Sequence, residues 1–222
     1  MLCNLTVVRD NIRNREGKRV YYLAKGDQLT SDARDYLTRE RIEILPASQA
    51  RPQRYRLLNG GYMETKPEHM THLNAEILVD KTHPRIAFRG AVDSLEAELL
   101  LCGCAATGEI RKQLEEALNY TRTLLRNEVL DEPVTAETLG GMDEKALRER
   151  SHRPQDFYGQ PHFMPSPDDG ALLLQVNRAR CAARAAELRA VAAFPTGRED
   201  LLRAFNRLSS FLYLIMIQLK KM

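Results

Sequence analysis

The clearest feature of the hydrophobic pattern is an amphipathic helix within the stretch from Lys66 to Ala106. Its apolar positions recur at steps of three and four, the spacing of a helix with one face against a core: Val92, Leu95, Leu99, Cys102 and Ala106. Arg89, Asp93 and Glu96 form a second, charged stripe with the same spacing. A charged stripe is usually only a solvated face, so this one does not define a site by itself.

Helical spacing returns four more times before the end of the chain, at residues 109–130, 142–152, 171–194 and 198–222. The first of these has an apolar inner face made of Ile110, Leu114, Ala117, Leu118, Thr121, Leu124 and Leu125. The last repeats apolar residues at Phe205, Leu208, Leu212, Ile215 and Leu219. Long helices joined by modest loops predict a mainly α protein built as a four- or five-helix bundle.

The first 46 residues predict a small α/β module ahead of the bundle. Residues 19–26 and 41–46 have the composition of strands, and a helix with Thr30 or Ser31 as its N-cap lies between them. Residues 47–65 combine Pro52, Gly60 and Gly61 with basic and polar side chains, which indicates a linker. We therefore expect a β-α-β module over 1–46, a linker over 47–65 and a helical bundle over 66–222.

Residues 153–170 form a proline-rich and aromatic segment between two helices. Four prolines and two glycines predict irregular backbone there, and the Phe and Tyr content is high for a solvated loop. We interpret the segment as a binding loop.

Composition limits the classes of partner. The net charge of +3 indicates neither a nucleic-acid-binding nor a membrane-surface protein. The most apolar run, 211–217, is far shorter than the roughly 20 residues that span a bilayer. We see no secretory leader, and the scattered cysteines are typical of a reduced, cytoplasmic protein. Cys102 and Cys104 are two apart on a helix, which suits small buried side chains better than metal ligands.

Polar residues collect on the alanine-rich helix. Asn177, Arg180, Arg184 and Glu187 lie at steps of three, four and three, within a narrow arc. Their alanine neighbours allow close helix packing, which favours arginines that line a cleft or an interface. The alternative is an alanine-rich surface helix with solvated arginines. Asp93 is a candidate carboxylate partner for Arg180 or Arg184.

Common catalytic signatures are missing. The sequence has no Walker-type glycine loop, GxSxG, HExxH or CxxC motif. None of the five histidines has the i, i+4 partner of a helical metal site, and we predict no all-protein metal site. These histidines are His69, His72, His83, His152 and His162.

Several segments together resemble the corrinoid adenosyltransferases of the ethanolamine-utilisation type, which are related to the propanediol-utilisation type. The segments are KPEHMTHL at 66–73, DKTHPRIAFRGAVDSLEAE at 80–98, FNRLSSFLYLIMI at 205–217 and the leading segment GDQLTSDARDYLTRERIEI. The Phe163-Met164-Pro165 loop before Arg180, Arg184 and Glu187 is also similar. The resemblance covers nearly the whole chain.

The resemblance implies transfer of the 5′-deoxyadenosyl group of ATP, with Mg²⁺, to Co(I) of cobalamin. It implies that Asp93 and Arg180 form an ion pair across a subunit interface and that Phe163 displaces the lower ligand of cobalt. It implies ATP binding by Lys66, Thr71, His72, Lys81, Arg85, Arg184, Glu187 and Asn206. It also implies a homo-oligomer, trimer or dimer, that works with a reductase and a cobalamin-dependent lyase, in the cytoplasm or inside a bacterial microcompartment.

Two departures from the family pattern bear on metal and phosphate binding. The His-x11-Cys-Cys-x2-Cys motif of some ethanolamine-type enzymes has no counterpart here, so their metal dependence is not carried over. The arginine-arginine pair typical of the propanediol type is reduced, since Ala185 follows Arg184 and Leu188 follows Glu187, and its glycine-rich phosphate loop is absent. The loops at 66–72 and 80–85 are then left to bind phosphates.

Two other functions stay open at this point. A non-catalytic corrinoid carrier or chaperone would share the aromatic loop without needing Arg180 and Arg184. A structural bundle protein would use its charged stripes only for assembly.

Overall fold

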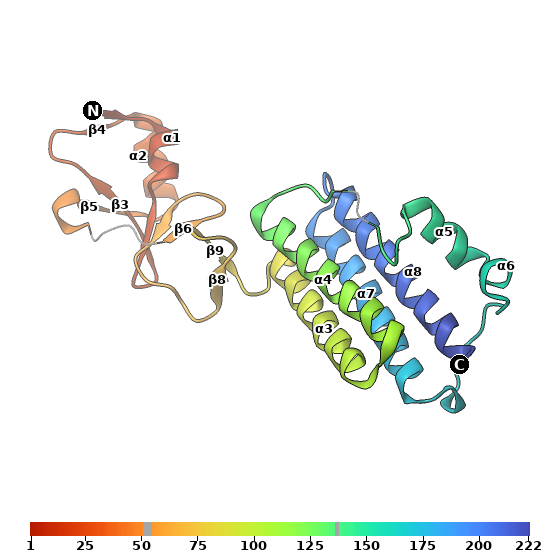
Figure 1. Ribbon diagram of the computed structural model, residues 1–222. Helices are drawn as coiled ribbons and strands as arrows, with labels where there is room; N and C mark the ends of the chain where they lie inside the picture. Colours follow the sequence, from red (N-terminus) through yellow and green to blue (C-terminus); the bar gives the residue numbers. More distant parts are fainter. Residues whose placement is uncertain (51–54, 136–137) are drawn as a thin grey trace. The chain divides into compact units, whose positions relative to one another are not determined.

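A computed structural model describes residues 1–50, 55–135 and 138–222. The chain divides into two compact units, Met1–His83 and Pro84–Met222 (Figure 1). The first is a small α/β unit, and the named elements of the second, among its described residues, are helices. The protein is therefore mainly α with a small N-terminal α/β unit, as predicted.

The first unit is built on a mixed sheet of seven short strands in the order β5-β3-β2-β7-β6-β9-β8. These strands are β2 (Arg13–Arg15), β3 (Lys18–Leu23), β5 (Glu43–Pro46), β6 (Tyr55–Leu57), β7 (Tyr62–Met63), β8 (Met70–His72) and β9 (Ile77–Asp80). A separate parallel pair and two helices complete the unit: β1 (Leu2–Cys3), β4 (Gln28–Leu29), α1 (Leu5–Asp10) and α2 (Ser31–Arg39). A 3-10 turn, Ala47–Gln49, follows β5.

The predicted β-α-β motif is present. Strands β3 and β5 pair in parallel, with Val20 opposite Glu43, and α2 connects them with Thr30 as its N-cap. Because a parallel pair needs a crossover, the helix must return along the sheet, and it buries Ala33 and Leu37. These two side chains share a core with Cys3, Val8, Tyr21 and Ile42.

The predicted linker and the domain boundaries are wrong. Residues within 47–65 form β6 and β7, an antiparallel hairpin, and β7 continues the sheet in parallel with β2. Glycine is required at Gly61, just before β7, because φ there is 84° and an added Cβ would lie 2.5 Å from the Ile12 carbonyl oxygen. Residues 66–83, expected in the bundle, form β8 and β9, and the helical unit begins at Pro84. Pro52, which supported the linker interpretation, lies outside the described residues.

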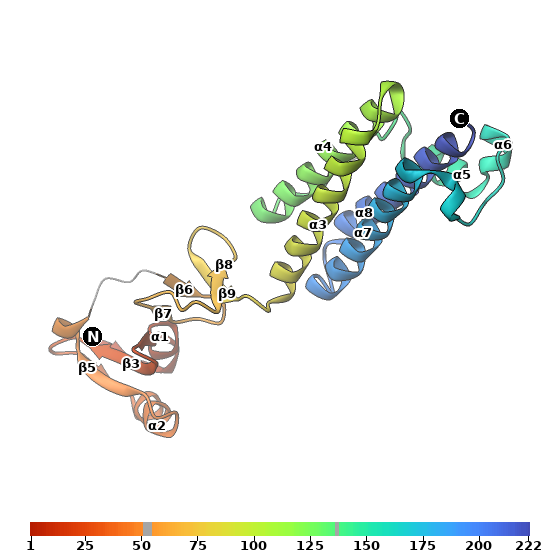
Figure 2. The ribbon, with the colours of Figure 1, turned by 90° about the horizontal axis from the view of Figure 1, so that it is seen from below.

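The second unit contains four long helices that run side by side (Figures 1 and 2). They are α3 (Pro84–Ala105), α4 (Gly108–Leu130), α7 (Ala171–Ala193) and α8 (Glu199–Lys220). Two shorter helices, α5 (Glu144–His152) and α6 (Pro154–Tyr158), contact α8. The predicted bundle and its five helices are therefore confirmed, while α1 and α6 were not predicted.

The predicted apolar stripe of α3 forms part of the bundle core. Its five residues are at most 1% exposed, and Phe88, one turn earlier, contacts Phe194 and Phe205 edge-to-face at ring-centroid distances of 5.9 and 5.5 Å. Helix α7 packs against α3 and α8 and buries only small residues along most of its length, namely Ala179, Ala183, Ala186 and Ala190. Small side chains allow the neighbouring helix backbones to approach closely.

The segment 153–170 is less irregular than predicted. Pro154 starts α6, a position that suits proline because the first amide of a helix has no acceptor within the helix. Pro167 starts a 3-10 turn, Pro167–Asp169, with a capping box between Ser166 and Asp169. The backbone between these turns, which carries His162 and Phe163, has no regular structure.

A buried carboxylate joins the start of α3 to the end of α4. The Glu128 side chain is fully buried and accepts hydrogen bonds from Arg85 Nε at 2.6 Å and Arg89 Nε at 2.7 Å. Arg85 also donates to the Glu128 carbonyl oxygen at 3.0 Å and lies over the Phe194 ring. Two guanidinium groups around one carboxylate offset the cost of burying the charge.

Replacing Glu128 by alanine should therefore lower the free energy of unfolding by about 3–5 kcal/mol, because two half-buried arginines lose their acceptor. Glu115→Ala, on the same helix, removes an exposed partner of Arg111 and should cost only about 0–1 kcal/mol. Denaturant unfolding of both variants measures the difference. Equal losses would contradict a structural role for the buried cluster.

Candidate active site

A pocket of ≈330 Å³ lies in the helical unit where α7, α8, the end of α5 and the aromatic loop meet. Its lining residues are Ser151, His152, His162, Arg180, Arg184, Ser209, Ser210 and Tyr213. Two positive charges from α7 thus lie in the same pocket as an aromatic ring from α8 and an imidazole from the loop.

The polar arc of α7 divides into two pairs of contacts. Arg180 donates from Nε and Nη2 to the side-chain oxygen of Asn177, at 3.1 and 2.9 Å, which fixes its guanidinium. One turn further, Glu187 accepts hydrogen bonds from the side chain of Asn206 on α8 at 3.1 and 3.4 Å. Arg184, between them, is exposed and has no hydrogen bond or ion pair with any residue that the structure describes. The arc therefore presents one oriented guanidinium, one available guanidinium and one carboxylate.

The aromatic loop is tied to the C-terminal half of α8. Phe163 stacks on Tyr213 at a centroid distance of 6.3 Å. The Lys220 ammonium lies over the Phe163 ring, 5.5 Å from its centroid. Lys220 also forms an ion pair with Asp169 at the end of the loop. The hydrogen bonds from Lys220 and the Ser166 amide lower the pKa of Asp169, so the carboxylate stays charged at neutral pH and its stabilising contribution is lost only in acid.

His162, beside Phe163, has contacts at both ring nitrogens. Its Nδ1 lies 2.9 Å from the Tyr213 hydroxyl, and its Nε2 lies 3.1 Å from the carbonyl oxygen of His152. The imidazole also stacks on the Tyr213 ring, with an interplanar angle of 13°.

The serine hydroxyls of the pocket are not activated nucleophiles. Ser209 and Ser210 donate to the Asn206 carbonyl oxygen at 2.8 and 3.2 Å, and Ser151 donates to the Arg148 carbonyl oxygen at 3.0 Å. Activation would require a hydrogen bond to a general base instead. The chemistry that this pocket supports is therefore binding and charge stabilisation rather than covalent catalysis.

Two predicted site residues of α3 lie away from this pocket's lining. Asp93 is exposed and has no partner among the described residues, so the expected ion pair with Arg180 or Arg184 does not form within this chain. Arg85, expected to bind phosphate, is engaged by Glu128 and would have to exchange that contact for a ligand.

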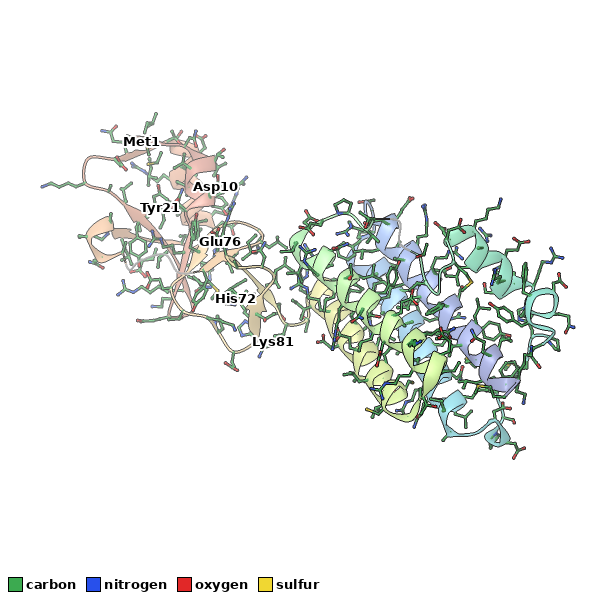
Figure 3. All side chains as sticks on the ribbon, in the orientation of Figure 1. Met1, Asp10, Tyr21, His72, Glu76 and Lys81 are labelled. Atoms are coloured by element: carbon green, nitrogen blue, oxygen red, sulfur yellow. The ribbon has the colours of Figure 1, made fainter. Side chains whose placement is uncertain are left out.

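The remaining predicted residues belong to the N-terminal unit, on and beside the β8–β9 hairpin (Figure 3). Thr71 and His72 are part of β8, and the His72 ring lies 5.6 Å from that of Tyr55. Lys81 follows β9, and its ammonium group is 3.8 Å from the Glu68 carboxylate. Lys66 is exposed in the loop before β8. The hairpin thus brings three of these four side chains onto one short element.

No group of three metal-binding side chains occurs within residues 1–50, 55–135 and 138–222. Cys102 is buried, and burial raises the pKa of its thiol to about 11, so it remains protonated. Cys104 is exposed, contrary to the expectation that both side chains would be buried.

The sequence interpretation missed Tyr213, His162 and Glu128. Tyr213 follows Asn206 by seven residues, which places both on one face of α8, so helical spacing offered a signal for it. The contacts of His162 depend on how an irregular loop folds back onto α8. Glu128 lies near the end of the apolar face of α4, and nothing in the sequence around it indicates its arginine partners. No local pattern predicts either of these arrangements.

A helical bundle of this kind is shared with known corrinoid adenosyltransferases. A solved variant of the PduO-type enzyme from Lactobacillus reuteri, complexed with cobalamin and ATP, matches 68% of this chain and 86% of its own with a TM-score of 0.54 at 18% identity. Another variant of that enzyme, complexed with ATP, matches with a TM-score of 0.52. These similarities establish the fold.

Sequence relatives establish the family. The model of the cobalamin adenosyltransferases matches residues 61–219. The corrinoid adenosyltransferase EutT of Salmonella typhimurium is 28% identical, over 96% of this chain and 90% of the relative. EutT of Escherichia coli is 30% identical, over 79% of this chain and 68% of the relative. The chain belongs to the cobalamin adenosyltransferase family and is a transferase that acts on corrinoids.

Among the described helices, none is both long and apolar enough to cross a membrane.

Proposed function

We propose that the protein transfers the 5′-deoxyadenosyl group of ATP to Co(I) of cobalamin, through the pocket between α7, α8 and the aromatic loop. The observation that carries the proposal is the pairing of Arg180 and Arg184 with an aromatic loop in a pocket whose serine hydroxyls are all bonded to backbone carbonyls. Co(I) is itself a strong nucleophile, so the reaction needs no protein nucleophile.

The chemistry consists of one displacement. The electron pair of Co(I) forms the Co–C5′ bond, the C5′–O bond breaks, and both electrons of that bond leave with the triphosphate. The protein must align C5′ with cobalt and stabilise the charge on the leaving phosphates. Arginines and lysines stabilise the charge on the leaving phosphates without any proton transfer.

ATP is assigned to the polar arc of α7 and to Asn206 of α8. Arg184 binds a phosphate group. Glu187 and Asn206 bind the ribose or Mg²⁺, and these two side chains are hydrogen-bonded to each other. A single partly exposed carboxylate suits Mg²⁺, which keeps several waters and takes its other ligands from phosphates. Lys66, Thr71, His72 and Lys81 of the N-terminal unit are proposed to bind ATP phosphates, as the family resemblance implies. Arg85 is proposed to do so when it exchanges Glu128 for ATP.

The corrin is assigned to the side of the pocket next to Phe163. In this role the phenyl ring occupies the lower face of cobalt, excludes water and the dimethylbenzimidazole base, and favours reduction to Co(I). The stack on Tyr213 and the cation above the ring support a fixed orientation for Phe163.

Asp93 and Arg180 are assigned to an ion pair between subunits of a homo-oligomer, trimer or dimer. The exposed position of Asp93, without a partner in the described chain, supports this assignment. The similarity to EutT supports a role in ethanolamine utilisation. The proposal also includes a reductase that supplies Co(I), a cobalamin-dependent lyase that uses the product, and a location in the cytoplasm or a bacterial microcompartment.

The decisive experiment is anaerobic incubation of the protein with reduced cobalamin and ATP, followed by absorption spectroscopy. Adenosylation removes the Co(I) spectrum only when ATP is present. A non-catalytic carrier would bind the corrinoid and leave that spectrum unchanged.

Asp93→Asn should lose most of its activity and weaken assembly, because a desolvated arginine left without its carboxylate costs about 3–5 kcal/mol. Glu115→Gln, which alters an exposed pair within the chain, serves as the control. Sedimentation velocity and turnover measure both effects. Wild-type behaviour of Asp93→Asn in both assays would remove Asp93 from the site.

Arg184→Ala should weaken ATP binding roughly ten-fold to a hundred-fold, since a charge-assisted contact contributes about 1.5–3 kcal/mol. Lys81→Ala should have a similar effect. Arg189→Ala is the matched control, because Arg189 is also exposed on α7 and has no partner in the described part of the chain. Calorimetry with ATP decides the matter, and normal affinity in both Arg184→Ala and Lys81→Ala would refute the phosphate assignment.

Phe163→Ala should leave ATP affinity nearly unchanged while it slows adenosylation and reduces four-coordinate Co(II). Electron paramagnetic resonance of cob(II)alamin with ATP reports that coordination directly. Met164→Ala, at the neighbouring and highly exposed position, should keep the wild-type signal. An unchanged signal in Phe163→Ala would reassign Phe163 to loop packing and make Phe157 or Tyr158 the next candidate.

A further inference from the structure

The two hydrogen bonds of His162 define which atoms carry protons. The His152 carbonyl oxygen can only accept, so His162 Nε2 must donate to it across 3.1 Å. In the neutral imidazole Nδ1 is then an acceptor, and the Tyr213 hydroxyl must donate to it across 2.9 Å. This chain of donors runs from α8 through the loop to the end of α5.

The same tyrosine ring also contacts the phenyl group next in sequence. His162 and Phe163 both stack on Tyr213, with centroid distances of 5.7 and 6.3 Å and interplanar angles of 13° and 24°. The hydrogen bonds set the height and tilt of the imidazole, and the adjacent residue must follow because the backbone joins them. Phe163 itself has no polar atom that could fix its position.

Tyr213 and His162 also face the charged end of the pocket. Tyr213 and His162 line it together with Arg180 and Arg184 from α7 and His152 from α5, while Lys220 of α8 lies over Phe163. With its proton donated to His162, the Tyr213 oxygen has only lone pairs left to present on its other side. An acceptor suits a surface next to two guanidinium groups.

We propose that His162 and Tyr213 are positioning residues that hold Phe163 in the orientation required for the corrin, acting as one hydrogen-bonded unit. This proposal rests on the proposed adenosyltransferase function and on the role of Phe163 in it. Neither residue takes a proton from a substrate: their contribution is geometric, and it acts on the corrin side of the site rather than on ATP.

The test uses variants that remove a hydrogen bond and keep a ring. Tyr213→Phe deletes the hydroxyl, and His162→Phe deletes both ring nitrogens. Each should raise the KM for the corrinoid and reduce the four-coordinate Co(II) signal by roughly ten-fold, with the ATP Kd within about two-fold of wild type. A role in general stability would instead lower the unfolding temperature and affect both substrates.

Two further variants make the result specific. His162→Gln should restore most of the signal, since its amide nitrogen can donate to the His152 carbonyl while its oxygen accepts from Tyr213. Tyr36→Phe removes a tyrosine hydroxyl that has no hydrogen-bond partner among the described residues, and it should behave as wild type.

The double variant His162→Phe/Tyr213→Phe distinguishes one unit from two independent contributions. A shared unit predicts about the same ten-fold loss as either single variant, whereas independent roles predict about a hundred-fold loss. Wild-type corrinoid KM and Co(II) signal in both single variants, or multiplicative losses in the double variant, would overturn the proposal. Because His162 lies on an exposed loop, its variant remains informative even if Tyr213→Phe fails to fold. Failure of the wild-type protein to consume Co(I) with ATP would instead refute the proposed function.

Discussion

The packing of small residues along α7 is the constraint on which the site depends. Ala179, Ala183, Ala186 and Ala190 are fully buried, and their spacing sets the rotation of the helix against α3 and α8. Arg180, Arg184 and Glu187 each follow one of these alanines by a single residue. Because successive residues are rotated by about 100° around the helix axis, the polar arc lies about 100° around α7 from the buried alanines. The close contact that small side chains permit therefore also determines where the two guanidinium groups point.

The opposite wall of the pocket is held in a different manner. Three separate contacts with α8 stabilise the loop that carries Phe163: the Asp169–Lys220 ion pair, the His162–Tyr213 hydrogen bond and the ring stack on Tyr213. A loop held by a few polar contacts has a lower local stability than a packed helix. The site thus combines a wall set by close helix packing with an aromatic wall whose orientation depends on these three contacts.

The sequence was sufficient for features that repeat and insufficient for features that depend on single contacts. The stripes of α3, α4 and α8 extend over several turns, so helical spacing predicted their buried faces and the arc on α7. The hairpins β6–β7 and β8–β9 have strands of two to four residues, too short to show alternation, and their glycine-containing turn resembled a linker. Phe163 was selected because prolines and aromatic residues surround it. Its support from His162 and Tyr213 joins residues 51 positions apart and requires the fold.

The two arginines of the pocket differ in how free they are to bind a ligand. Asn177 holds Arg180 from two nitrogens of the guanidinium, which reduces the entropy lost when that group meets a carboxylate and suits a fixed pair at an interface. Arg184 is exposed and has no partner in the described chain, so its position is set only when a ligand arrives. A flexible cation can follow negative charge as it moves from the C5′–O bond onto the departing phosphates. This difference favours an assembly role for Arg180 and a phosphate role for Arg184, although both belong to the same helical face.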